Sequence, residues 1–354
     1  MADAPATFAE TIRAAAAGGR SLRIRGGGTK DFYGQALEGE ILDTRSCTGI
    51  VAYDPTELVI TARGGTPLAE VEAALAGKGQ MLAFEPPHFG AGATLGGVVA
   101  AGLSGPRRAA AGAVRDFVLG VRLMDGRGES LSFGGQVMKN VAGYDVSRLV
   151  AGSLGTLGVI LEVSLKVLPV PIAEATLRFE MPEGRALETL NQWAGRPLPI
   201  SATAYADGDL SVRVSGAAAA VREACAKLGG ERIDDPETGR FWTGIREHTD
   251  PFFRGGEPLW RLSVPSVAPP LALEGQGLVE WGGSLRWLKS NAEARTIRDA
   301  ATRAGGHATL FRGGDKSVGV FQPLAPAIAA IHRRLKAEFD PQQIFGRGRM
   351  YADL

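Results

Sequence analysis

Three glycine-rich stretches in the first half of the chain carry residue types and spacings that can do chemistry. The first, Arg25-Gly26-Gly27-Gly28-Thr29-Lys30, follows a short apolar run. The second extends from Pro86 to Arg107, and the third from Lys139 to Ile160. Glycine lets another group approach the backbone closely, and successive backbone N–H groups form nests that bind anions. These stretches therefore predict a ligand site lined by backbone, suited to a phosphate or diphosphate.

Two common phosphate motifs do not describe these stretches. A dinucleotide fingerprint starting at Gly26 needs glycine at position 31, where the chain has Asp31. The Gly77-Lys78 pair is followed by Gly79, so it is no Walker A loop. From the residues alone, three alternatives remain open: a plain loop at the first stretch, a buried helix of small residues at the second, and close packing of strands or helices at the third.

Composition and charge narrow the classes of function. The 39 Lys and Arg balance 38 Asp and Glu, which argues against a dedicated nucleic-acid binder. Two distant cysteines, Cys47 and Cys225, argue against a disulfide scaffold, a zinc ribbon or a cysteine-ligated iron–sulfur cluster within this chain. The four histidines, at positions 88, 248, 307 and 332, lack metal-ligand spacing, so no metal site is predicted. Glycine, with 49 of 354 residues, is about twice as frequent as the usual ~7%.

Short strands separated by turns are expected to position the glycine-rich stretches. A helix is predicted after Thr66 and Pro67, with Thr66 as its N-cap, an apolar face formed by Leu68, Val71 and Leu75, and its end at Gly77. The turn at residues 126–128 predicts a hairpin. The predicted strands are Ser21–Arg25, Glu40–Thr44, Glu57–Ala62, Phe117–Asp125, Glu129–Phe133 and Gly158–Val167.

The second half of the chain begins with the order β-α-β-β-α that is typical of a ferredoxin-like domain. Pro169 and Pro171 mark the boundary before it, and no internal repeat is detected. The predicted strands are Glu174–Met181, Ile200–Ala206, Leu210–Ser215, Leu259–Val264 and Gly277–Trp281, followed by one beginning near His307. The predicted helices are Glu183–Ala194, Ala217–Leu228, Asn291–Ala304 and Ala325–Phe339.

Taken together, the three stretches resemble flavoproteins of the vanillyl-alcohol oxidase / p-cresol methylhydroxylase (PCMH) type. That family has an Arg-Gly-Gly-Gly loop, a Thr-Leu-Gly-Gly turn and a Gly-Ser-x-Gly-Thr-Leu-Gly segment, all found here in the same order. The segment Phe339–Phe345 resembles the family's closing segment, although Gly346-Arg347-Gly348 replaces the usual Asn-Pro-Gly. Gly105–Arg108, Lys139–Asp145, and Trp281-Gly282-Gly283 with Trp287 resemble, more narrowly, the FAD-binding subunits of bacterial glycolate oxidases.

This resemblance implies an α+β fold with non-covalently bound FAD. Residues 1–172 are expected to form a two-lobed PCMH-type FAD-binding domain, and residues 173–324 an inserted ferredoxin-like α+β cap domain that contacts substrate or another subunit. Residues 325–354 are expected to return to the FAD domain. The implied cofactor-binding residues are Arg25, Gly26, Gly27, Gly28, Thr29, Lys30, Pro86, Gly92, Ala93, Thr94, Leu95, Gly96, Gly97, Ala101, Gly102, Ser104, Gly105, Arg107, Gly155, Gly158, Val159 and Ile160.

The resemblance also implies a reaction. Such a subunit belongs to a complex with a larger flavoprotein and an iron–sulfur subunit. The complex oxidises glycolate, and also D-lactate, to the corresponding 2-oxo acid. The alternatives are a self-sufficient PCMH-type flavin oxidoreductase acting on another alcohol, and a non-catalytic flavin-binding subunit. No catalytic base is assigned. His307 is a candidate for a role beside the substrate or the flavin, and Arg286 and Lys289 are candidates for binding the carboxylate. The alternatives are a structural or surface role for His307 and a subunit contact at Arg286 and Lys289. No signal peptide or transmembrane segment is predicted, so the expected location is cytoplasmic, at the inner membrane face through partners.

Overall fold

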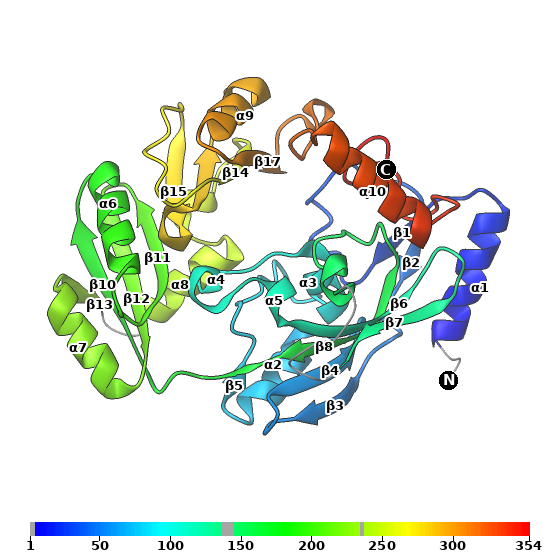
Figure 1. Cartoon of the computed structure of the whole chain (residues 1–354), viewed down its shortest axis with the longest axis horizontal. Coiled ribbons are helices and arrows are strands. Elements are labelled where there is room, and N and C mark those ends of the chain that lie inside the picture. Colours follow the sequence, from blue (N-terminus) through cyan, green and yellow to red (C-terminus); the bar gives the residue numbers. More distant parts are fainter. Residues whose placement is uncertain (1–3, 136–144, 234–236) are drawn as a thin grey trace. The chain divides into compact units, whose positions relative to one another are not determined.

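The computed structural model describes residues 4–135, 145–233 and 237–354, which form two compact units (Figure 1). The first unit contains residues 1–103, 113–169 and 323–354, and the second contains residues 104–112 and 170–322. Both units combine helices with antiparallel sheets, which confirms the predicted α+β class. Within the described ranges, no helix combines the length and the apolarity that crossing a membrane requires.

A five-stranded antiparallel sheet forms the centre of the first unit, in the order β3-β4-β8-β6-β7, and Figure 1 labels all five strands. Its middle strand, β8, is buried along almost its whole length, because sheet neighbours and helices cover it. The predicted hairpin at 126–128 is confirmed by the pairing of Met124 with Ser130. The strands are β3 Ile50–Asp54, β4 Val59–Arg63, β6 Val118–Met124, β7 Ser130–Gly134 and β8 Val159–Lys166.

Helices pack around this sheet through short apolar faces. In α2 the predicted face of Leu68, Val71 and Leu75 is fully buried. The predicted cap at Thr66 is wrong: its hydroxyl accepts a hydrogen bond from the backbone N–H of Gly49 (2.9 Å), so it joins the helix start to a neighbouring loop. The helices are α1 Ala4–Ala17, α2 Leu68–Ala76, α3 Leu95–Ala101, α5 Val114–Phe117, the 3₁₀ turn η1 Ser147–Val150, and α10 Pro326–Phe339.

The C-terminal segment returns to the beginning of the first unit. Strands β1 (Leu22–Arg25) and β2 (Glu40–Asp43) pair in parallel, and Phe345 extends this ladder beside Leu22. The backbone of Leu22 accepts from Gly346 (2.9 Å) and donates to Ile344 (2.6 Å). Phe345 and Ile344 are fully buried in one cluster with the apolar face of α1. A short pair, β5 (Gln80–Met81) with β9 (Leu168–Pro169), completes the unit.

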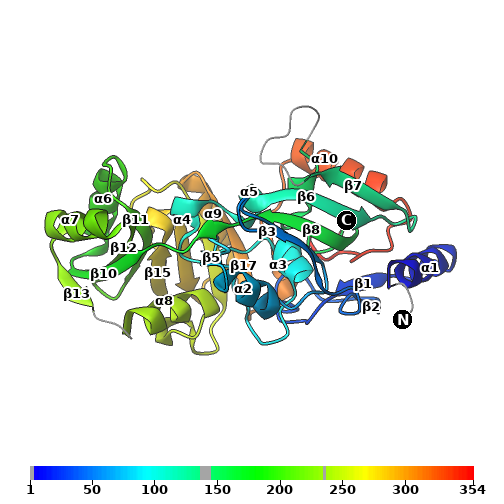
Figure 2. The ribbon, with the colours of Figure 1, turned by 90° about the horizontal axis from the view of Figure 1, so that it is seen from below.

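The second unit is built on one eight-stranded antiparallel sheet in the order β13-β10-β12-β11-β15-β16-β14-β17. Helices α6 and α7 pack on one face of its first four strands, and α8 packs on the other (Figure 2). The strands are β10 Ala173–Glu180, β11 Ile200–Ala206, β12 Asp209–Gly216, β13 Glu231–Ile233, β14 Leu259–Ser263, β15 Gln276–Glu280, β16 Leu285–Lys289 and β17 His307–Arg312. The helices are α6 Glu183–Ala194, α7 Ala218–Leu228, α8 Glu237–Glu247 and α9 Ala294–Arg303, with 3₁₀ turns η2 Pro251–Phe253, η3 Trp281–Gly283 and η4 Lys316–Val318.

This sheet consists of two halves with the same strand topology. If the strands of each half are numbered along the chain, β10–β13 lie in the order 4-1-3-2, and β14–β17 give the same order read from the other end. The first half confirms the ferredoxin-like prediction. The second half replaces the first helix of that pattern by a proline-rich connection, residues 264–275. The sequence shows no repeat because the topology depends on the pattern of buried positions rather than on residue identity.

Residues 104–112, which contain α4 (Arg108–Ala111), pack with the second unit, unlike the contiguous first domain expected from the sequence. The indole N–H of Trp281 donates to the carbonyl of Gly105 (3.1 Å). The Arg107 guanidinium pairs with Glu174 (2.5 Å) and donates to Ser215 (3.2 Å). These interactions fasten the segment to the sheet of the second unit.

Candidate functional site

A cleft in the first unit is bordered by segments that lie far apart in the sequence. One wall is the end of β1 with the loop that follows it, residues 23–31. A second wall comes from α3 and the residue before it, and a third from Leu154 and Gly155. Gly346, Arg347 and Arg349 of the C-terminal segment also line the cleft. The full lining is Arg23, Ile24, Arg25, Gly26, Gly27, Gly28, Thr29, Lys30, Asp31, Ala36, Leu37, Glu38, Thr94, Gly97, Ala100, Ala101, Leu154, Gly155, Gly346, Arg347 and Arg349.

Two glycines in the first wall have geometries that no other residue fits. A Cβ atom on Gly27 would lie 1.5 Å from the carbonyl oxygen of Gly92, so the two loops meet backbone to backbone. Gly28 has φ +72°, and a Cβ there would lie 2.2 Å from the Arg25 guanidinium. The first two glycine-rich stretches therefore pack directly against each other. This contact explains the role of Gly92, which does not line the cleft itself.

The basic residues of the loop are held in place by its neighbours. Arg25 Nε lies 2.7 Å from the Asp31 carboxylate, so this ion pair spans the turn. Lys30 Nζ donates to the carbonyl of His88 (3.1 Å) and lies 5.6 Å from the centre of the Phe89 ring. Both cations border the cleft while they fix the conformation of the loop.

The second wall is a short helix rather than an irregular glycine run. Thr94 caps α3, because its hydroxyl accepts from the backbone N–H of Gly97 (3.3 Å). Leu95, Val98 and Val99 are buried beneath it, and α3 ends at Gly102 in the left-handed conformation. The small residues that remain on the other side of α3, including Ala101, line the cleft. A short helix with small side chains thus leaves room beside the loop for a ligand.

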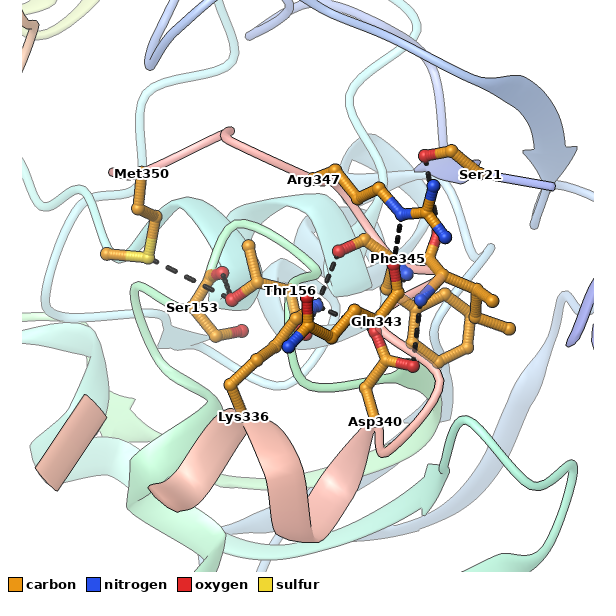
Figure 3. A network of polar contacts seen from close by, with 10 residues as sticks. Ser21, Ser153, Thr156, Lys336, Asp340, Gln343, Phe345, Arg347 and Met350 are labelled. Atoms are coloured by element: carbon orange, nitrogen blue, oxygen red, sulfur yellow. Dashed lines mark hydrogen bonds and ion pairs between the residues drawn. The ribbon is translucent and has the colours of Figure 1, made fainter. Parts of the chain in front are cut away.

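A buried ion pair fastens the C-terminal wall (Figure 3). Lys336 Nζ lies 2.7 Å from Asp340 Oδ2, and it also donates to the carbonyls of Thr156 (2.8 Å) and Phe345 (2.6 Å). Asp340 accepts from the backbone N–H groups of Ile344 (3.0 Å) and Phe345 (2.8 Å). Burial lowers the pKa of Lys336, and the charge of Asp340 opposes that shift. The pair therefore ties α10 to the third glycine-rich stretch and shapes the turn that leads into the cleft.

Arg349 joins the end of the chain to the segment after the glycine loop. Its guanidinium donates to the carbonyls of Asp31 (3.1 Å), Tyr33 and Gln35. Burial lowers the pKa of Arg349, with Asp31 opposing the shift. The Gly346-Arg347-Gly348 sequence, which departs from the Asn-Pro-Gly of the related flavoproteins, adds Arg347 to the lining of the cleft.

The charge of the cleft matches a diphosphate. Five basic residues line it, namely Arg23, Arg25, Lys30, Arg347 and Arg349, against the two acidic residues Asp31 and Glu38. The Nε atom of Arg23 is buried and makes no hydrogen bond with the described residues. A buried guanidinium nitrogen without a partner is costly unless a ligand completes its hydrogen bonding. Sequence reasoning missed Arg23, although it alternates with Leu22 and Ile24 in a strand that leads into the glycine loop.

The predicted cofactor residues fall into three groups. Arg25, Gly26, Gly27, Gly28, Thr29, Lys30, Thr94, Gly97, Ala101 and Gly155 line the cleft. Pro86, Gly92, Ala93, Leu95, Gly96, Gly102, Gly158, Val159 and Ile160 belong to the first unit but do not line it. Ser104, Gly105 and Arg107 belong to the second unit. Of the Lys139–Asp145 motif, residues 139–144 lie outside the described residues.

Two of the candidate catalytic residues hold the fold of the second unit. Arg286 is buried and donates to the carbonyls of Gly283 (2.8 Å) and Ala268 (2.7 Å). Burial lowers its pKa, while Glu183, 3.5 Å away, raises it. Lys289 Nζ donates to the carbonyl of Arg254 (3.0 Å). These interactions give both side chains structural partners within the second unit.

His307 differs from those two residues. It is exposed at the start of β17, and its side chain makes no hydrogen bond or ion pair with the described residues. Burial of part of the ring and the positive charge of Arg261 lower its pKa. A lowered pKa favours the neutral imidazole, which can accept a hydrogen bond. Among residues 4–135, 145–233 and 237–354, no group of three or more His, Cys, Asp or Glu is arranged to hold a metal ion.

Comparison with known proteins places this chain in a family. Residues 2–134 match the family model described as an FAD binding domain. The glycolate oxidase subunit GlcE of Escherichia coli (strain K12) is 52% identical over 333 residues, which cover 94% of this chain and 93% of GlcE. This chain belongs to the GlcE family. FAD is therefore its cofactor, and the cleft described above lies in the unit that contains all the matched residues except 104–112.

Other relatives of this GlcE-family chain match a smaller part of it. The glycolate oxidase subunit GlcD of Bacillus subtilis (strain 168) is 32% identical over 39% of this chain and 29% of GlcD. A D-lactate dehydrogenase of Archaeoglobus fulgidus is 35% identical over 41% of this chain and 33% of that enzyme. An alkyldihydroxyacetonephosphate synthase superimposes with a TM-score of 0.66 at 16% identity, covering 95% of this chain and 74% of the synthase. That likeness shows a shared fold.

Proposed function

We propose that this chain is the FAD-binding subunit of a glycolate oxidase complex. The observation that carries the proposal is the 52% identity to E. coli GlcE over 94% of the chain. The basic, glycine-lined cleft in the first unit supports it, because it fits the diphosphate of FAD. The complex oxidises glycolate, and also D-lactate, to the corresponding 2-oxo acid.

The cleft residues divide the work of holding FAD. The backbone N–H groups of residues 26–28 and the guanidinium of Arg23 would hold the diphosphate of FAD, and Thr94 and Gly155 would line the same site. Bound FAD supplies the capacity to accept a hydride from an alcohol carbon. The lining contains no His or Cys, the side chains through which some relatives attach FAD covalently. Binding is therefore non-covalent.

The proposal also includes partners. Two cysteines are too few for an iron–sulfur cluster ligated by this chain alone, so electrons must leave through another carrier. Cys47 is buried with its thiol 3.7 Å from the carbonyl of Leu161, and Cys225 lies elsewhere, on α7. We place beside this chain a larger flavoprotein subunit related to GlcD and an iron–sulfur subunit that takes up the electrons.

The experiment is co-expression of this chain with its neighbouring flavoprotein and iron–sulfur subunits. The complex is expected to purify intact, to carry FAD on this chain, and to lose flavin absorbance near 450 nm when glycolate is added without oxygen. A chain with its FAD site disabled by Gly27→Ala is expected to lower the flavin content of the complex. Absence of flavin from the purified chain after incubation with FAD would refute the proposal.

A further inference from the structure

Three polar side chains are grouped on one face of the sheet in the second unit. Arg261 and Ser263 are two residues apart on β14, so they point to the same face. His307 on β17 is the direct cross-strand partner of Ser263. The opposite face, formed by residues such as Leu262 and Leu310, is buried beneath α9. Alternation therefore gives this part of the sheet one apolar face and one face that carries these polar groups beside the buried rings of Trp287 and Phe311.

Arg261, the cation of this group, has no ion-pair partner among the described residues. Arg261 is partly exposed and makes no hydrogen bond or ion pair with the described residues. Its guanidinium lies 5.2 Å from the centre of the Trp281 ring, and that ring is itself held by the bond from its indole N–H to Gly105. A guanidinium held by a buried aromatic ring is oriented while its donors remain available.

Hydrogen-bonding groups stand beside the cation without protein partners. Neither Ser263 nor His307 makes a side-chain hydrogen bond with the described residues. Directly opposed residues of an antiparallel pair have Cβ atoms about 4.5–5.5 Å apart, and diagonal ones about 7–8 Å. Arg261 is diagonal to His307, so one small molecule can contact the guanidinium and the imidazole together.

Other charged groups near this face do not neutralise Arg261. Arg108 stacks on Trp281 at 4.3 Å, which adds a second positive charge. Arg312 on β17 adds a third, and burial lowers its pKa. Glu280 is buried and accepts from the indole N–H of Trp287 (2.7 Å). The face thus favours an anion.

We propose that Arg261, Ser263 and His307 form a binding site for a small 2-hydroxy acid. Arg261 pairs with the carboxylate, and Ser263 and His307 make hydrogen bonds with the hydroxyl group. The proposal rests on the proposed function for the chemical class of its ligand, since both the acid and the hydroxyl are then required. The proposal assigns the carboxylate to Arg261 and not to Arg286. Arg286 is the cross-strand partner of Leu262, so it lies on the face of the sheet opposite to that of Arg261.

The test measures binding of glycolate to the purified full chain by isothermal titration calorimetry. Arg261→Gln is expected to weaken binding by roughly 10- to 100-fold, the range for loss of a charge-assisted hydrogen-bonded pair. The affinity of Arg261→Lys for glycolate is expected to lie between those of Arg261→Gln and the unmodified chain, because lysine keeps the charge and loses the bidentate geometry. The matched control is Arg303→Gln, an exposed arginine at the end of α9.

Each result separates this site from the proposed function. Glycolate binding that is equally tight in Arg261→Gln and in the unmodified chain overturns the site, as does no binding to the unmodified chain. If Arg261→Gln fails to fold, Arg261→Lys and Ser263→Ala give the same comparison with smaller changes. Binding through Arg261, together with a complex that does not oxidise glycolate, leaves the site in place and refutes the proposed function. If the complex oxidises glycolate but this chain does not bind it through Arg261, the proposed function stands and the site is refuted.

Discussion

Lys336 Nζ lies 2.7 Å from Asp340 Oδ2, and both side chains are almost completely buried, at 4% and 0% exposure. The same carboxylate accepts from the backbone of residues 344 and 345, and the same ammonium donates to Thr156. This buried pair thus connects the C-terminal segment, residues 336–345, to Thr156 and fixes the turn before Arg347 and Arg349. The C-terminal wall of the cleft depends on this pair (Figure 3).

Removal of the ammonium from this pair is expected to destabilise the chain strongly. Lys336→Met leaves the Asp340 charge buried without its counter-ion, a change that costs about 3–5 kcal/mol. Urea unfolding followed by far-UV circular dichroism measures the loss. The matched control is Lys227→Met, which breaks a pair of the same i,i+4 spacing and the same 2.7 Å distance to Glu223 on the exposed surface of α7. Equal effects of the two substitutions would contradict the structural role of the buried pair.

Gly27→Ala is expected to abolish FAD binding. The added methyl group collides with the backbone of Gly92, 1.5 Å from its carbonyl oxygen, so the two loops must separate. Flavin content after purification with excess FAD measures the effect. Gly239→Ala is the control, because a Cβ at that position of α8 meets no atom of the described residues within 4 Å. Full flavin occupancy in Gly27→Ala would show that the loop contact does not shape the cofactor site.

Arg23→Gln is expected to weaken FAD binding by about tenfold or more, because a charged hydrogen bond to a phosphate contributes roughly 1.5–3 kcal/mol. Quenching of FAD fluorescence during titration of the apoprotein gives the dissociation constant. Arg20→Gln serves as the control, since Arg20 lies on the surface paired with Glu40 and does not line the cleft. An unchanged dissociation constant in Arg23→Gln would remove Arg23 from the diphosphate site.

The stability of the second unit is expected to fall as the pH drops below about 6.5. Burial, with smaller contributions from Arg312 and Arg261, holds the pKa of His248 well below its ordinary value of 6.5. The unfolded chain therefore binds a proton at a higher pH than the folded chain does. Stability is fully present above 6.5 and declines toward the lower folded pKa by up to about 1.4 kcal/mol per pH unit.

Tryptophan fluorescence can follow this decline, because all five tryptophans, residues 193, 242, 260, 281 and 287, belong to the second unit. His248→Asn is expected to reduce the slope between pH 7 and pH 5, and to lower stability at pH 8, since it removes the stacking of His248 on Phe253 at 3.9 Å. Asparagine tolerates the φ of +54° at this position. His307→Gln, at an exposed site whose pKa is also lowered, is expected to change the slope less. An unaltered slope in His248→Asn would assign the acid sensitivity to other groups.

The flavin is expected to leave the polypeptide on denaturation. Because the cleft lining contains neither His nor Cys, acid precipitation should release yellow FAD into the supernatant. Absorbance of the supernatant and of the redissolved pellet near 450 nm measures the distribution. Colour that remains in the pellet after washing would show a covalent bond.

Local features of the chain could be predicted because they depend on neighbouring residues. The alternating pattern of β10–β12, the hairpin at 126–128 and the helix α6 follow from short-range periodicity and turn chemistry. The glycine loops were also visible, since a glycine-rich turn after a strand is a local signal. The prediction for Thr66 was wrong because its hydroxyl can either cap the following helix or bond to another loop. In the folded chain it accepts a hydrogen bond from the backbone N–H of Gly49 instead of capping the helix.

The sequence by itself determined that this chain has an α+β fold with a backbone-lined phosphate site, and its motifs resembled one flavoprotein family. Only the tertiary structure decided which side chains share a surface. It brought Arg347 and Arg349 beside a loop more than 300 residues earlier, and it placed Arg107 with Glu174 in the second unit. It also turned Arg286 away from the face that presents Arg261. Strand register and long-range packing determine where these side chains lie, and neither can be predicted from a short stretch of residues.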